Sequence, residues 1–146
     1  FKKAERLELK TSGTISFTVR LSATAKTASS ATNLSDGVWH HVVGTYAPST
    51  EVKIYVDGVL ADTESASIPA SLTDDATIPV YMGSYSNSTA ERYAGDMDEV
   101  AIWNKTLELA EIETIYDSTN DNPGKCANLF TGGLGTNLVL WNRMGD

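Results

Sequence analysis

The sequence predicts an all-β fold, an antiparallel β-sandwich with one short helix toward its C-terminal end. Several short segments alternate apolar and polar residues, and clusters of Gly, Asp, Asn and Ser separate them. Only one segment places apolar residues at helical spacing. Many short strands joined by frequent turns are typical of sandwiches.

The first predicted strand covers residues 14–21, where polar residues separate four apolar ones: Ile15, Phe17, Val19 and Leu21. This alternation indicates one buried face. Residues 23–37 are small and polar, so we expect a loop or irregular edge that ends in a turn at Asp36-Gly37. Residues 38–46 are β-branched and aromatic, which predicts a second strand.

Residues 52–60 predict a β-hairpin. Apolar residues alternate from Val52 to Val56, and Asp57-Gly58 tolerates the positive φ of a type I′ turn. After a polar stretch, residues 78–84 predict another short strand with Pro79 near its start, where a missing N–H does least harm.

Residues 98–103, "DEVAIW", predict a strand whose second half is covered on both faces. In the stretch that follows, "LELAEIETIYD", Leu109, Ile112 and Ile115 recur at helical intervals and predict a helix of about three turns at most. Residues 118–137 are rich in Asn and Gly, as in a linker or irregular loop, and residues 138–146 are strand-like.

Four motifs resemble, in order, the laminin G-like, concanavalin A-like jelly-roll family: "DGVWHHVVGTY", "VKIYVDGVLADT", "IPVYMGS" and "YAGDMDEVAIWNKTLELAEIETIYD". The resemblance runs from about Gly13 to Asp117. It implies a jelly-roll β-sandwich of two curved antiparallel sheets packed face to face, with the short helix on the rim. Few residues precede the first matched strand, so we expect residues 1–117 to form such a domain with its N-terminal strands missing.

The closing "LVLWNRMGD" resembles the strand that opens a domain of this family. We therefore expect residues 118–137 to link the domain to a second module that begins with the strand at residues 138–146. This linker and the stretch after it also resemble multi-module structural proteins of marine phages.

The net charge of −8 repels phosphate backbones and anionic membrane surfaces. We therefore expect neither nucleic acid nor membrane as a partner. Cys126 is the only cysteine, which excludes an intrachain disulfide and a cysteine-rich metal site.

His40 and His41 are adjacent, and neighbouring side chains on a strand point to opposite faces. The two rings therefore cannot chelate one ion together. We expect a histidine buried and hydrogen-bonded in the sandwich, with Trp39 packed nearby. Catalysis would need a nucleophile or carboxylate partner, and nothing in the sequence supplies one.

Asp96, Asp98 and Glu99 form the densest acidic cluster beside a predicted strand. Asp96 and Asp98 share a face, an arrangement that suits paired carboxylates in hydrolysis or ligands of a hard cation. The resemblance implies a structural calcium ion at Asp98, and a plain surface or turn role is the alternative. Glycoside hydrolases of this class carry a Glu-x-Asp-x-x-Glu-like strand, which the sequence lacks.

A ligand surface needs aromatic faces for sugar C–H groups, with amides or charged groups to bond the hydroxyls. Five residues in or beside one predicted loop have this chemistry: Tyr81, Tyr85, Asn87, Arg92 and Tyr93. Ordinary loop and sheet packing is the alternative role for these residues.

The favoured function is a non-enzymatic adhesion or glycan-binding module of an extracellular or virion surface protein, such as a phage tail fibre. Its expected partners are a glycan or surface receptor and other subunits of an assembly. Two alternatives stay open. One is a purely architectural subunit of a particle or filament, and the other is a glycoside hydrolase whose catalytic strand lies outside this sequence.

Overall fold

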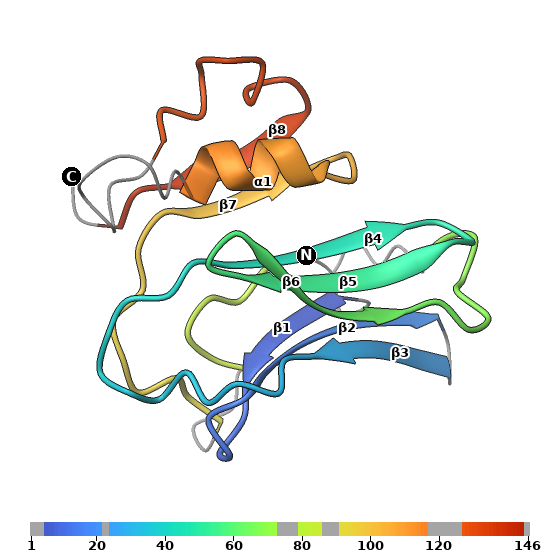
Figure 1. Ribbon diagram of the computed structural model, residues 1–146, viewed down its shortest axis with the longest axis horizontal. Helices are drawn as coiled ribbons and strands as arrows, with labels where there is room; N and C mark the ends of the chain where they lie inside the picture. Colours follow the sequence, from blue (N-terminus) through green and yellow to red (C-terminus); the bar gives the residue numbers. More distant parts are fainter. Residues whose placement is uncertain (1–4, 22–23, 73–78, 86–90, 117–126, 145–146) are drawn as a thin grey trace.

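The computed structural model describes residues 5–21, 24–72, 79–85, 91–116 and 127–144. Three antiparallel sheets and a short helix make up its regular structure (Figure 1). The first sheet has the order β1 (Glu5–Leu9), β2 (Ile15–Leu21), β3 (Thr24–Ser29). The central sheet has the order β4 (Val42–Ala47), β5 (Glu51–Val56), β6 (Val59–Glu64), and β7 (Val100–Trp103) pairs with β8 (Leu138–Asn142) after helix α1 (Leu109–Tyr116). The predicted all-β sandwich with one short helix is confirmed.

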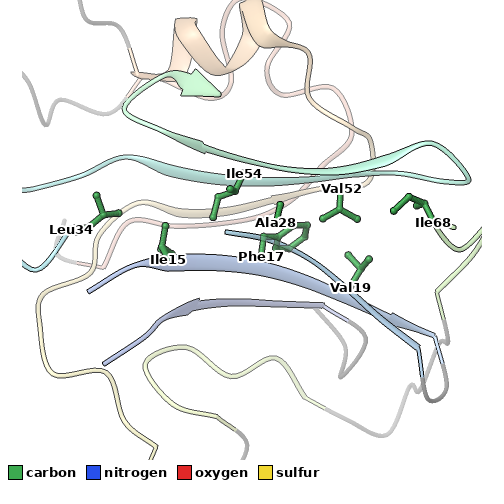
Figure 2. Close-up of a cluster of buried hydrophobic side chains, with 8 residues drawn as sticks. All are labelled: Ile15, Phe17, Val19, Ala28, Leu34, Val52, Ile54 and Ile68. Carbon is green, nitrogen blue, oxygen red and sulfur yellow. The ribbon is translucent and has the colours of Figure 1, made fainter. Parts of the chain in front are cut away.

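The main hydrophobic core lies between the first sheet and the central sheet. Ile15, Phe17 and Val19 point from β2 toward Val52 and Ile54 of β5 (Figure 2). Strand alternation explains this arrangement, because every second residue of β2 and β5 faces the opposing sheet. Each fully buried side chain of this size contributes about 1.5–3 kcal/mol relative to an exposed one.

A second core covers the other face of the central sheet. Tyr55 is the neighbour of Ile54 on β5, and it packs with Ile112 and Ile115 of α1 and with Leu129 and Leu134. The central sheet is therefore a middle layer, with β1–β3 on one side and α1, β7 and β8 on the other (Figure 1). Its middle strand β5 is covered on both faces, which is why it is apolar at the consecutive positions Ile54, Tyr55 and Val56.

The predicted hairpin at residues 52–60 is confirmed. β5 and β6 pair antiparallel, and the turn residues Asp57 and Gly58 have φ angles of 51° and 77°. Positive φ at both central positions is the requirement of a type I′ turn. Gly58 is also needed for space, because a Cβ there would lie 2.9 Å from Cδ1 of Tyr116.

The helix prediction is confirmed as well. Ile112 and Ile115 face the second core, and Glu111 bonds back to the start of the helix by accepting the Glu108 backbone N–H at 3.0 Å. An ion pair between Lys105 and Glu111 fixes the same turn. Together these contacts lower the pKa of Glu111, the Lys105 hydrogen bond being the larger cause.

The expected loop at residues 23–37 contains a strand at Thr24–Ser29, so this part of the prediction is wrong. β3 is polar because it lies at the edge of the first sheet, where only Ala28 is fully buried. β1 was not expected at all. Residues 79–84 form no strand beyond an isolated bridge between Ser84 and Arg92, and β7 begins at Val100 rather than at residue 98.

The segment from residue 127 to 144 packs onto the rest of the chain. β8 pairs with β7, and Leu129 and Leu134 are buried in the second core. The division at residue 117, the linker over 118–137 and the second module from residue 138 stay predictions. No helix in the described part of the chain is long and apolar enough to cross a membrane.

Candidate functional site

The predicted ligand residues gather on one surface hairpin. The chain returns on itself through an antiparallel bridge between Ser84 and Arg92. Two backbone hydrogen bonds flank that bridge, from Tyr85 N–H to Glu91 O at 3.0 Å and from Tyr93 N–H to Gly83 O at 2.8 Å. We call the described residues 81–85 and 91–93 the tyrosine hairpin. Asn87 lies outside the described residues.

The tyrosines of this hairpin are accessible. Tyr81, Tyr85 and Tyr93 are 41%, 40% and 42% exposed. The guanidinium of Arg6, on β1, lies 4.8 Å from the ring centroid of Tyr85, a cation–π contact that holds one ring beside the first sheet. Half-exposed rings held by the backbone offer apolar faces without a large cost in side-chain ordering. The structure thus places Tyr81, Tyr85, Arg92 and Tyr93 on one hairpin, and their ligand-binding role stays a prediction.

The acidic pair precedes β7 on irregular backbone. Asp96 and Asp98 are both exposed, and Asp98 accepts the backbone N–H of Glu99 at 2.8 Å. Calcium takes about six to eight oxygen ligands, whereas no group of three His, Cys, Asp or Glu side chains forms within the described residues. These residues do not by themselves complete a calcium site, and the calcium role of Asp98 stays a prediction.

His40 lies between two carboxylates that the sequence reading did not connect with it. Its Nδ1 is 2.8 Å from Oδ2 of Asp57, and its Nε2 is 3.1 Å from Oδ1 of Asp36. The Asp57 hydrogen bond is the main cause that raises the pKa of His40, and Asp36 adds to it. Both ring nitrogens are engaged, so this histidine clamps the loop at residues 36–40 to the β5–β6 turn and has no nitrogen left for a substrate.

His41 has a different environment from its neighbour. It is half-buried, and its ring stacks on Tyr116 with 5.8 Å between centroids. Burial lowers its pKa, so the neutral ring is favoured, and Nδ1 has no hydrogen-bond partner. The two rings have separate partners, but both histidines precede β4, which begins at Val42 rather than at residue 38, so the strand alternation predicted for them is wrong. The expected hydrogen bond to a buried histidine is not formed at Nδ1 of His41, and Trp39 is 62% exposed rather than packed in the sandwich.

An aromatic pocket near β8 was missed by the sequence reading. Five residues line it: Ala127, Asn128, Phe130, Trp141 and Arg143. Its members fall in the predicted linker and the predicted second module, which the sequence predicts to be separate parts of the chain. The useful signal was the combination of Trp, Asn and Arg in "WNR" with an aromatic residue shortly before it.

Comparison with known proteins agrees with the fold and with the motifs. A laminin G family model, described as the concanavalin A-like lectin/glucanases superfamily, matches residues 3–113. The chain belongs to this superfamily. The match covers the first and central sheets, the tyrosine hairpin and most of α1, whereas the aromatic pocket lies mainly outside it.

One similar solved structure is the crystal structure of residues 221–444 of an S-layer domain-containing protein from Clostridium thermocellum. It is 25% identical, with a TM-score of 0.46, and the alignment covers 75% of this chain. The chain spans about half of that solved chain, 54%. No curated protein matches the sequence. Membership of a superfamily named for lectins and glucanases indicates a module of the carbohydrate-binding or adhesion type.

Proposed function

We propose that the chain is a non-enzymatic module that binds a glycan or a glycosylated surface receptor, within a protein displayed on a cell or virion surface. The tyrosine hairpin is its contact surface. The observation that carries the proposal is the grouping of three half-exposed tyrosines on one hairpin of a superfamily that includes lectins. Aromatic rings of this kind stack on the C–H faces of sugars, and Arg92 on the same hairpin carries a guanidinium that can donate to hydroxyl groups.

Binding rather than hydrolysis is supported by the state of the charged groups. A glycosidase needs an acid and a second carboxylate about 5–9.5 Å apart on either side of the bond it cleaves. Both ring nitrogens of His40 are hydrogen-bonded to Asp36 and Asp57, and the Asp98 carboxylate accepts the backbone N–H of Glu99. These groups have structural partners already, and the sequence lacks the catalytic strand pattern of jelly-roll hydrolases.

A glycan array tests the proposal. The chain should bind a subset of glycans, and Tyr85→Ala should weaken that binding at least about tenfold, as expected for an aromatic residue at the centre of a contact surface. Tyr85→Phe keeps the ring and should retain most of the affinity. Leu109→Ala on α1 is a matched control, because it removes an exposed apolar side chain from another element.

An array with no bound glycan would contradict the proposed function. Binding that survives Tyr85→Ala and Tyr93→Ala together would show that another surface is responsible. Release of sugar from any bound glycan would restore the hydrolase alternative.

A further inference from the structure

The aromatic pocket is an open hollow of about 450 Å³ at the end of β8. This volume falls within the range of about 300–1,000 Å³ that small-molecule sites occupy. Phe130 is 75% exposed, and its ring packs edge to face on Trp141, with 5.2 Å between centroids and 61° between planes. Two rings at this angle form an apolar corner that opens to solvent.

Residues far apart in sequence hold that corner in place. The indole N–H of Trp141 donates to Oε2 of Glu99 at 2.5 Å, and Nε of Arg143 donates to Oε1 of the same carboxylate at 3.1 Å. The guanidinium of Arg143 also lies 5.2 Å from the Trp141 ring centroid. The φ angle of Glu99 is +53°, an unusual value for a residue other than glycine. The fold thus maintains a locally unfavourable backbone at the residue whose carboxylate binds Trp141 and Arg143, two of the residues that line the pocket.

The lining selects a class of ligand. Apolar ring faces with polar groups at the rim, here from Asn128 and Arg143, suit a molecule with C–H faces and hydroxyl edges. The charge of Arg143 is balanced by Glu99, and the chain as a whole carries −8, so the pocket offers no net attraction to an anion. A neutral sugar satisfies both conditions, whereas an acidic sugar does not.

We propose that the aromatic pocket binds a single neutral pyranose ring, stacked on Phe130 and bounded by Trp141. This assigns a second carbohydrate site, separate from the tyrosine hairpin and mainly outside the family-matching segment. The proposal rests on the proposed function, because it assumes a module that recognises carbohydrate. It predicts that a glycan with two suitable rings contacts the module at two places.

The test is a titration of the ¹⁵N-labelled chain with methyl β-glucoside and methyl β-galactoside, and with glucuronate as the acidic comparison. Binding is followed through the tryptophan indole N–H signals. Trp141 should shift saturably at millimolar sugar, while Trp39 and Trp103 serve as internal references. Trp103 is not among the residues that line the pocket, and its indole N–H donates to Leu134 O at 2.7 Å. Phe130→Ala should weaken the sugar affinity at least fivefold, and Phe130→Tyr should preserve it. Because Phe130 is exposed, neither variant should unfold the chain.

Several outcomes would overturn the pocket proposal. They are no Trp141 shift with either glycoside, equal shifts of all three indoles, an affinity unchanged by Phe130→Ala, or tighter binding of glucuronate than of the neutral sugars. If Tyr85→Ala abolishes glycan binding on the array and the Trp141 indole signal does not shift with sugar, the pocket proposal is refuted and the proposed function stands. If the Trp141 signal shifts saturably and Tyr85→Ala does not change glycan binding on the array, the pocket proposal is supported. The tyrosine hairpin is then refuted as the contact surface.

Discussion

Gly44 is the position where one added carbon should disturb the sandwich most clearly. It lies on β4 opposite Phe17, which is 3% exposed, and a Cβ there would fall 2.3 Å from Cγ of that ring. Carbon atoms pack at about 3.5–4.0 Å, so the ring or the strand must move by more than about 1 Å. Overpacking of this kind costs about 1–3 kcal/mol, and a gap this short favours the upper end.

A smaller effect opposes the clash. Alanine restricts the unfolded chain more than glycine does, which stabilises the folded state by roughly 0.5–1 kcal/mol where the backbone conformation permits it. We therefore expect Gly44→Ala to lower the free energy of unfolding by about 2 kcal/mol in total. Urea unfolding, followed by circular dichroism, measures this value directly.

A second substitution separates the clash from other causes. Phe17→Leu opens space and should cost roughly 1.5 kcal/mol alone, but in the Gly44→Ala background the two costs should add to less than their sum. Gly95→Ala is the matched control, because its Cβ would meet only the outer end of the exposed Tyr93 side chain. Wild-type stability for Gly44→Ala, or strict additivity in the double variant, would refute the reasoning.

Two further predictions concern the clamp and the second core. The pKa of His40 is raised in the folded state by Asp57, so its contribution to stability should be full below about pH 6.5 and disappear as pH rises through the folded value. The difference in urea midpoint between wild type and His40→Gln should therefore shrink from about pH 6 to pH 9, and a difference that grows over this range would contradict the clamp. Ile112 is fully buried, so Ile112→Ala should lower the free energy of unfolding by about 2–5 kcal/mol. Leu109 is exposed, so Leu109→Ala should change it by about 0.5 kcal/mol. Equal losses would show that α1 does not pack as described.

The elements that the sequence predicted correctly are those whose pattern follows directly from burial. Ile15, Phe17 and Val19 alternate with polar residues because one face of β2 lies on the core. The turn at Asp57-Gly58 was predictable because these residue types tolerate the positive φ angles that they have in the structure. β1 and β3 were missed because edge strands need few apolar residues. β3 is held by pairing with β2 and by a hydrogen bond from Ser29 N–H to Asp62 of β6, and neither contact leaves a local pattern.

The candidate functional surfaces likewise divide into one that local sequence indicates and others that depend on contacts between distant residues. The residues of the tyrosine hairpin could be grouped from the sequence because they lie close together along the chain and share one chemistry, although the strand predicted at residues 78–84 is not formed. The His40 clamp joins residues 17 apart, and the contact between Glu99 and Trp141 joins residues 42 apart. Such contacts exist only after the sheets have paired. β7 also begins later than predicted because the positive φ of Glu99 interrupts the strand.

The layering of the sheets explains why recognition is assigned to loops. The central sheet has one face on the main core and the other on the second core, so neither face offers an open groove within the described residues. Ile54 and Tyr55 of β5 lie in the main core and the second core respectively, and Phe17 of β2 belongs to the main core with Ile54. Exposed aromatic rings beside polar groups are instead found on the tyrosine hairpin and at the end of β8. The glycan-binding role proposed for this module therefore rests on those two surfaces, and the exposed Tyr85 and Phe130 can be changed without altering either core.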